Sequence, residues 1–344
     1  MGLQILNPNE YPDWDALLLR SRNHSFFHTS AWAKVLETTY RFKPLYFVLL
    51  EEGQIALLMP LMEVYSPLKG KRGVSLPFTD QCTPHVLKKE FLQGAVQCAI
   101  EYGKEKKWRY IEWRAGEYFA ERISPWEAYY VHDIDLVKPE SGLFSVLSDN
   151  NRRNIKKAIR EGVAVKIGQS FDSIESFYRL NCITRKRHGL PPQPFTFFKY
   201  VFEYIISKGC GTVVSASHKE KVIAASVFFH FGTSALFKYG ASEMENQNLR
   251  PNNLIMWEAL KWYSHQGFKT MNLGRTELEN HGLLQYKRTW GAKESLLKYY
   301  RYDIRKKTYL KKRPGSGDLY TRLFARTPTS ILRIIGRLFY KHAG

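Results

Sequence analysis

Apolar and polar positions follow one order that occurs twice along the chain. In the first copy, PLYFVLLEEGQIALLMPLMEV (residues 44–64) places Glu-Glu-Gly between two apolar runs, which predicts a β-hairpin. VLKKEFLQGAVQCAIEYGKEKK (86–107) then has the spacing of an amphipathic helix, and YIEWR (110–114) reads as a strand. This copy predicts a hairpin, a further strand, a loop, a helix and a closing strand.

The second copy repeats this order. TVVSASHKEKVIAASVFFHF (212–231) predicts a hairpin that turns at Lys219 to Lys221, and SALFKYGASEMENQNLRPNN (234–253) a third strand and a loop. LIMWEALKWYSHQG (254–267) has helical spacing and TMNLGR (270–275) follows as a strand. We therefore expect an α/β (α+β) protein with an internal duplication: two lobes, each built on a mixed sheet, around a central cleft.

A basic helix is predicted between the two copies, after the strand-forming segment ISPWEAYYVHDIDLV. In NNRRNIKKAIR, helical spacing places Ile155 and Ile159 on one face and Arg152, Lys156 and Arg160 in a stripe of like charges. Since like charges four residues apart repel one another, this stripe is a candidate anion-binding site. The alternative is a solvated face that two packed isoleucines hold down.

Charge adds a second basic region at the C-terminus. The formal net charge is +20, and the residues from Arg301 onward hold 12 Lys and Arg against 2 Asp and Glu. Within them, TPTSILRIIGRLFYKHAG predicts an amphipathic helix that sets Ile331, Leu332, Ile334, Ile335, Leu338 and Phe339 against Arg333, Arg337 and Lys341. Residues 305–344 are thus a candidate surface for an anionic membrane, or else the apolar side packs on the protein itself.

Several classes of chemistry lack their sequence signals. The sequence contains no GxSxG, P-loop or dinucleotide fingerprint, and its cysteines and histidines show no metal-ligand spacing, so no metal site is predicted. Neither a signal peptide nor a membrane span is indicated, which favours a cytoplasmic location. Acyl transfer from an activated ester or thioester to an amine fits these limits, because it needs bound substrates and oxyanion stabilisation rather than a protein nucleophile.

Three motifs resemble those of the Fem-type non-ribosomal peptidyltransferases and the related BioF2-like acetyltransferases, whose lobes have the acetyltransferase-type (GNAT) fold. They are SAWAKVLE (30–37), TRKRHGL (184–190) and GLLQYKRTWG (282–291). The resemblance covers about residues 26–303. It implies two tandem GNAT-like lobes, 1–140 and 141–303, followed by the basic tail 304–344.

The resemblance also implies roles for individual residues. Lys34 and Arg187 match the family's contacts to the diphosphate of a nucleotide-linked cell-wall precursor, and Lys287 matches the lysine near the reacting carbonyl. Lys287 is accordingly the candidate catalytic residue. The candidates for substrate binding beside Lys34 and Arg187 are Tyr286 and Trp290, which flank Lys287, and Tyr239 and Arg275, which end strands at the expected cleft.

The acyl donor stays open at this point. The usual acetyl-CoA loop of the fold is replaced by NLRPNNL (248–254), which lacks the glycines that let backbone amides approach a pyrophosphate. We predict an acyl or aminoacyl transferase that forms an amide bond on a phosphate-bearing cell-envelope precursor (peptidoglycan or exopolysaccharide) at the inner face of the membrane. No resident cofactor is expected, and the donor is aminoacyl-tRNA or an acyl-CoA. The alternatives are an acyl-CoA-dependent N-acyltransferase and a non-catalytic basic protein that binds nucleic acid or membrane.

Overall fold

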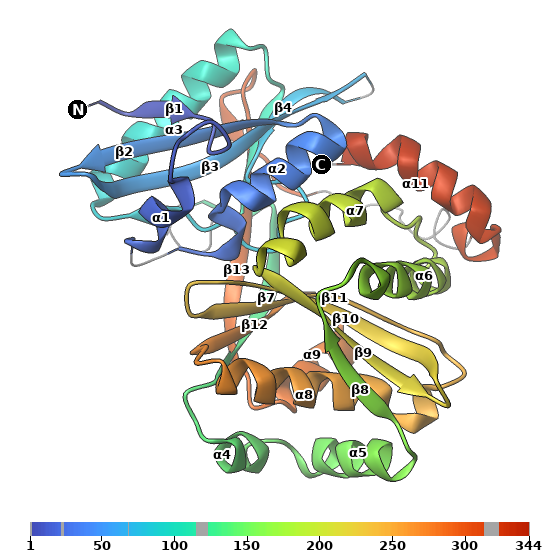
Figure 1. Ribbon diagram of the computed structural model, residues 1–344. Coiled ribbons are helices and arrows are strands. Elements are labelled where there is room, and N and C mark those ends of the chain that lie inside the picture. The colour runs from blue at the N-terminus through green and yellow to red at the C-terminus, as the bar shows by residue number, and fades with distance from the viewer. Residues whose placement is uncertain (1, 22–23, 68, 115–122, 313–322, 344) are drawn as a thin grey trace. The chain divides into compact units, whose positions relative to one another are not determined.

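A computed structural model describes residues 2–21, 24–67, 69–114, 123–312 and 323–343 (Figure 1). The chain divides into two compact units. Unit 1 comprises residues 1–130, 296–314 and 339–344, and unit 2 comprises residues 131–295 and 315–338. These bounds differ from the predicted lobes 1–140 and 141–303, because segments far along the chain return to each unit.

Unit 1 contains a mixed sheet in the strand order β1-β2-β3-β4-β6-β13, in which β4 and β6 are parallel. Its elements are β1 (Gln4–Leu6), α1 (Trp14–Leu19), η1 (Phe26–His28), α2 (Ser30–Tyr40), β2 (Lys43–Glu51), β3 (Gln54–Ser66), β4 (Gly70–Val74), β5 (His85–Val86), α3 (Lys89–Glu105), β6 (Tyr110–Arg114), the later part of β13 (Lys293–Asp303) and β14 (Thr308–Tyr309).

The hairpin predicted at Glu51–Gly53 joins β2 and β3, and a positive φ of 73° at its glycine closes the turn. Alternation along β2 sends Phe47 to the face covered by α3 and Tyr46 to the face where it meets Trp14 of α1. The sheet of unit 1 is therefore packed by helices on both faces.

Unit 2 has a mixed sheet in the order β7-β12-β11-β10-β9-β8, in which β11 and β12 are parallel. Its elements are β7 (Glu127–Asp135), α4 (Glu140–Ser145), α5 (Asp149–Arg160), β8 (Ala164–Gly168), α6 (Phe171–Arg187), α7 (Phe195–Tyr204), η3 (Ile206–Lys208), β9 (Gly211–His218), β10 (Lys221–Phe231), β11 (Ser234–Ser242), η4 (Gln247–Leu249), α8 (Pro251–His265), β12 (Thr270–Glu277), α9 (His281–Arg288) and most of α11 (Thr329–Ala343).

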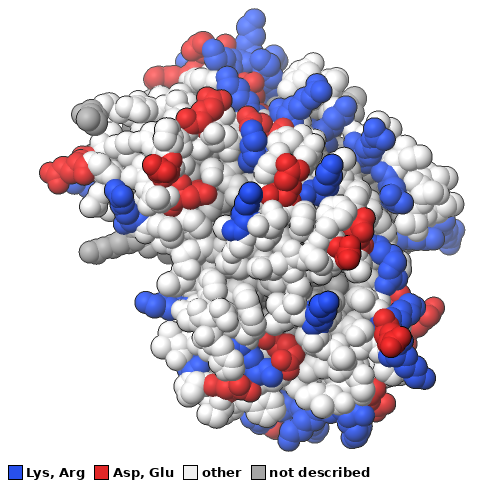
Figure 2. All heavy atoms as spheres, in the orientation of Figure 1, with Lys and Arg blue, Asp and Glu red and all other residues white. Residues whose placement is uncertain are grey.

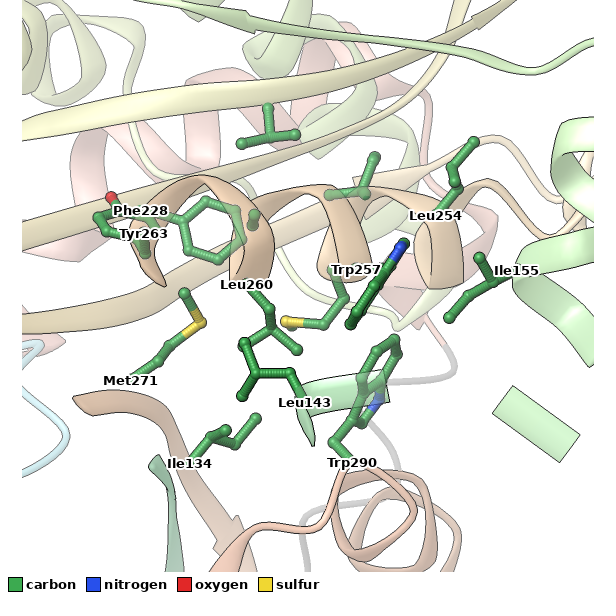
Figure 3. Close-up of a cluster of buried hydrophobic side chains, with 14 of the residues drawn as sticks. Ile134, Leu143, Ile155, Phe228, Leu254, Trp257, Leu260, Tyr263, Met271 and Trp290 are labelled. Atoms are coloured by element: carbon green, nitrogen blue, oxygen red, sulfur yellow. The ribbon is translucent and has the colours of Figure 1, made fainter. Parts of the chain in front are cut away.

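Helices cover both faces of this second sheet (Figure 1). α8 lies on one face with α4 and α5 beyond it, and α6 and α7 lie on the other. The main core of the unit fills the space around α8, where Trp257 and Leu260 meet Phe228 of β10 and Met271 of β12 (Figure 3).

The order predicted twice from the sequence is the order observed. β2, β3, β4, α3 and β6 in unit 1 correspond to β9, β10, β11, α8 and β12 in unit 2. What the pattern did not predict is the last strand of the first sheet. Residues 299–303 of β13, which follow unit 2 in the chain, pair with β6 and so belong to unit 1.

The basic helix α5 forms as predicted, with the hydroxyl of Ser148 accepting a bond from the N–H of Asn151 as N-cap. Its buried face was predicted wrongly. Asn151, Ile155 and Ala158 are buried, whereas Ile159 is 58% exposed. A helix turns about 100° per residue, so Ile159, four positions after Ile155, is rotated away from the face that α8 covers.

Among the described residues, no helix has the length and apolar character needed to cross a membrane.

Candidate active site in unit 2

A cavity of about 660 Å³ opens where β11 and β12 separate. The two strands pair from Ser234↔Thr270 to Leu236↔Asn272, after which β11 continues to Ser242 without β12 beside it in that register. A bulge in β11 at Lys238, opposite Val227 and Phe228 of β10, accompanies the divergence. The cavity is lined along this stretch of β11, and also by α5, α6, α8 and α9.

Amide side chains dominate the polar lining of the cavity. They come from the N-terminal turns of α5 and α8, from η4 and from α9, and they are Asn150, Asn151, Asn154, Gln247, Asn252, Asn253 and Gln285. Each amide can donate and accept hydrogen bonds, so this lining suits a ligand with mixed polarity, such as a peptide, a ribose or a nucleobase.

Lys287 lies in α9 with its ammonium turned to β12. Its Nζ donates to the carbonyls of Gly274 (2.8 Å) and Arg275 (3.2 Å), and the residue is 4% exposed. Gly274 has a φ of +72°, a conformation that favours glycine, and its N–H donates to Oδ1 of Asn272. A buried ammonium thus satisfies two carbonyls at the point where β12 leaves β11.

The C-terminal end of α9 is fixed against the start of α5. The carbonyl of Thr289 accepts from the N–H of Ser148 (3.0 Å) and from Nδ2 of Asn151 (3.1 Å). Gly291 follows with a φ of +72°, and a Cβ there would lie 3.1 Å from a side-chain carbon of Val146. The glycine that the sequence places after Lys287 therefore allows a close approach.

The two aromatic neighbours of Lys287 have different surroundings. Tyr286 lines the cavity, and burial raises the pKa of its hydroxyl to about 12, so it stays a protonated phenol at neutral pH. Trp290 is 0% exposed and reaches toward Trp257 in the core (Figure 3). Its ring centroid is 6.0 Å from that of Tyr286 in an edge-on arrangement. Tyr286 thus forms part of the cavity wall, whereas Trp290 packs in the core behind it.

A cluster of charged groups lies near Lys287. Glu294 accepts two hydrogen bonds from Arg288, at 2.9 Å each, and contacts Nε2 of His132 at 3.0 Å. Burial, and then the charge of Lys287, lowers the pKa of His132. The fully buried imidazole is therefore neutral at pH 7, and Lys287 is the cation of this interior region.

The first turn of α8 does not fit the pyrophosphate of a CoA. Pro251 has no N–H, and the N–H groups of Asn253 and Leu254 donate to the carbonyl of Arg250 (3.1 and 3.4 Å). The asparagine side chains are engaged as well. Nδ2 of Asn252 donates to Oε1 of Gln247 (3.2 Å), and Nδ2 of Asn253 donates to Oδ1 of Asn151 (2.9 Å). The amide of Asn252 alone cannot form the cradle that glycines would provide.

The structure brings together part of the predicted site. Arg187 lines the cavity at the end of α6, and its Nη1 donates to the carbonyl of Ser242 (3.5 Å). Arg275 contributes the carbonyl bound by Lys287. Tyr239 lies instead among the rings of Phe177, Phe197 and Phe198 of α6 and α7.

Lys34 belongs to unit 1. It lies on the exposed side of α2, and its Nζ is 3.5 Å from Glu37. Its predicted convergence with Arg187 stays a prediction.

The three residues of the predicted anion stripe, Arg152, Lys156 and Arg160, have different surroundings. Arg152 donates to the carbonyl of Ser145 and pairs with Asp149, whereas Arg160 lies 3.5 Å from Glu161. Lys156 is exposed. The sequence reasoning missed the asparagines of the same helix. Asn150, Asn151 and Asn154 share a face at helical spacing, and this spacing was the available signal.

Comparison with known proteins agrees with this fold. Residues 148–288 match the family described as acetyltransferase (GNAT) domain, a stretch that runs from α5 to α9. The chain therefore carries an acyltransferase domain of the GNAT superfamily.

Similar proteins include a glycyltransferase and two solved structures. Over 88 residues the chain is 29% identical to the Lipid II:glycine glycyltransferase of Staphylococcus haemolyticus, and the match covers 24% of this chain and 21% of that protein. The crystal structure of FemX superposes with a TM-score of 0.69 at 15% identity, over 88% of this chain and 97% of that chain. A tandem GNAT protein from the clavulanic acid biosynthesis pathway gives 0.56 at 9% identity, over 92% and 99%. Residues 148–288 thus match a GNAT acetyltransferase domain, and the fold is that of tandem GNAT proteins.

Proposed function

We propose that the protein transfers an acyl or aminoacyl group to an amine on a phosphate-bearing precursor of the cell envelope. The observation that carries this proposal is the amide-lined cavity at the divergence of β11 and β12, inside the matched acyltransferase domain. The acceptor class is supported by the glycyltransferase relative, whose name states that it acts on Lipid II.

The cavity favours an aminoacyl ester as the donor. The side-chain amides of Asn150, Asn154 and Gln285 offer donors and acceptors to a ribose or a base, whereas the first turn of α8 lacks the free amides that a pyrophosphate needs. An aminoacyl-tRNA would present an ester on a terminal ribose to this lining.

The outer side of α5 supports a polynucleotide donor. Arg153, Lys156 and Arg160 are exposed on the helix whose first turns line the cavity, and Figure 2 shows basic side chains gathered over the part of unit 2 where α5 lies. Such a run of cations next to a donor pocket suits the phosphates of a nucleic acid strand. This surface is where we propose that tRNA binds.

The reaction requires one bond to form as another breaks. The acceptor nitrogen attacks the ester carbonyl carbon, the C–O bond to the donor ribose breaks, and the proton lost by the amine balances the proton gained by the departing oxygen. Tyr286, a phenol at neutral pH that lines the cavity, is proposed to supply that proton.

Lys287 keeps its proposed catalytic role beside the structural one. Its buried charge makes the interior next to Tyr286 positive, which favours an oxyanion in the transition state. On this proposal Arg187, at the edge of the cavity, binds an anionic group of a substrate. Lys34 of unit 1 stays a proposed substrate-binding residue.

A CoA-dependent N-acyltransferase is the second candidate, and the family match favours it because that family is described as acetyltransferases. The two candidates differ in the donor. We propose to measure the binding of a non-hydrolysable aminoacyl-tRNA analogue, uncharged tRNA and acetyl-CoA to the full chain, followed by product formation with nucleotide-linked and lipid-linked muropeptides.

The aminoacyl proposal predicts that the charged tRNA analogue binds more tightly than acetyl-CoA and that an amide product forms. Arg187→Gln should weaken donor or acceptor binding about 10- to 150-fold, since a charge-assisted contact is worth about 1.5–3 kcal/mol. Lys166→Gln is the matched control, because it removes one positive charge from an exposed position of β8 that does not line the cavity. Tight binding of acetyl-CoA with transfer of its acetyl group would establish the second candidate instead.

A further inference from the structure

Helix α11 is docked on the protein along one side. Leu332 is fully buried, and a Cβ at Gly336 would lie 1.9 Å from the carbonyl oxygen of Pro192, so the helix backbone lies directly against the segment between α6 and α7. Arg333 stacks over the ring of Tyr178 with 5.6 Å to the centroid. At the last turn, Nη2 of the buried Arg72 donates to the carbonyl of His342 (3.0 Å).

The opposite side of the same helix carries apolar residues that remain exposed. Ile331, Ile334 and Leu338 are 47%, 59% and 53% exposed. At about 100° per residue these three positions fall within an arc of about 60°, whose middle lies about 150° around the helix from the middle of the arc that holds Leu332 and Gly336. We call these three residues the apolar ridge.

Cations border this ridge on one flank. Arg337 and Lys341 are exposed and lie about 90° and about 50° around the helix from the middle of the ridge, and the whole chain has a net charge of +20. Figure 2 shows Lys and Arg side chains along the part of the surface where α11 lies. An apolar ridge with a cationic flank has the arrangement of a helix that lies in the interface of an anionic bilayer.

We propose that the apolar ridge of α11 is a membrane-docking surface for an anionic lipid bilayer, with Ile331, Ile334 and Leu338 in the headgroup–acyl boundary and Arg337 and Lys341 on the headgroups. Charge complementarity selects this occupant. A second copy of the chain would bring Arg337 and Lys341 against a chain that is itself strongly positive, and that repulsion has no counterpart at an anionic surface. The inference rests on the geometry of α11 and deepens the proposed location of the reaction without depending on the reaction.

The sequence pattern offered docking on the protein or docking on a membrane as alternatives. The structure assigns each to a different side of one helix. Deleting α11 would therefore confuse the two, because the deletion would also expose the surface under Leu332. Point changes in the exposed ridge leave the docked side in place.

The test is flotation of the full chain with vesicles of phosphatidylglycerol and phosphatidylcholine, and with vesicles of phosphatidylcholine alone, in the absence of donor and acceptor. The expected result is binding to the anionic vesicles that weakens as salt is raised. The double variant Ile334→Asn, Leu338→Asn should lower the vesicle partition coefficient at least about 10-fold. Each change removes an apolar side chain, about half of which would otherwise be buried in the bilayer. Arg337→Gln with Lys341→Gln should lower it about 10-fold on anionic vesicles only.

Val137→Asn is the matched control, because Val137 is 71% exposed and lies outside α11. It should bind vesicles as the unchanged protein does, and all variants should keep their melting temperature. Equal binding of the ridge variant and the control overturns the proposal. A dimer in sedimentation equilibrium that Ile334→Asn abolishes also overturns it, in favour of a second copy. If the protein forms product from a soluble acceptor but does not bind vesicles, only this inference is contradicted. If it binds vesicles but transfers no acyl group, only the proposed function is contradicted.

Discussion

Replacing Lys287 with Met removes an ammonium from the interior while keeping most of the side-chain volume. In the structure this ammonium donates to the carbonyls of Gly274 and Arg275, at 2.8 and 3.2 Å, with the residue 4% exposed. The variant leaves both carbonyls without that donor. A hydrogen bond to a charged group is worth about 1.5–3 kcal/mol, and part of the loss of two such bonds is offset because the ammonium no longer has to be buried.

We expect a net loss of about 3 kcal/mol in the free energy of unfolding. For a folding unit of about 150–250 residues this lowers the melting temperature by about 6–12 °C. Lys261→Met is the matched control. Lys261 lies over the Trp257 ring, 5.9 Å from its centroid, but its charge pairs with Glu258 near the surface, so the expected loss is below about 1 kcal/mol.

The assay combines thermal unfolding with single-turnover transfer, measured well below the melting temperature of the variant. An oxyanion role predicts that turnover falls about 10²- to 10³-fold in the folded fraction. A melting temperature equal to that of the unchanged protein would refute the bonds to β12. Normal turnover in a destabilised but folded variant would refute the catalytic role and leave Lys287 as a structural cation.

Two further predictions concern stability. Gly336→Ala should destabilise the protein and loosen α11, seen as faster proteolysis of the tail, because its Cβ would lie 1.9 Å from the carbonyl oxygen of Pro192. Gly94→Ala in the exposed part of α3 has nothing within 4 Å and should stabilise by up to about 1 kcal/mol, so equal effects of the two changes would contradict the docking of α11. Burial lowers the pKa of His28 to about 3, so the unfolded chain takes up the proton first as the pH falls below 6.5, and stability present above that pH is lost toward pH 3. Protonation linked to His28 alone should lower the free energy of unfolding by about 2 kcal/mol at pH 5. His28→Gln should therefore weaken the dependence of the unfolding free energy on pH, measured by tryptophan fluorescence. An unchanged pH dependence would show that His28 is not the group responsible.

The sequence by itself determined the order of elements and the class of fold. Periods of two and of 3.6 residues are set by the backbone, so the hairpins at Glu51–Gly53 and Lys219–Lys221 and the helices α3 and α8 could be read directly from apolar spacing. The motif around Lys287 singled out the segment that forms α9, part of which lines the cavity, because glycine and aromatic residues beside a lysine are unusual on a solvated helix.

Only the tertiary structure decided where side chains point and what covers them. Period and propensity describe one element at a time, whereas burial depends on partners far along the chain. Spacing could not tell that Ile159 misses the face covered by α8, that Tyr239 turns to α6 and α7, or that the asparagines of α5 line a cavity with those of α8. Gly336 shows the same limit. Helix propensity alone predicts that Gly336→Ala stabilises the protein. The structure predicts that it destabilises the protein, because folding brings the carbonyl of Pro192, 144 positions earlier in the chain, against this glycine.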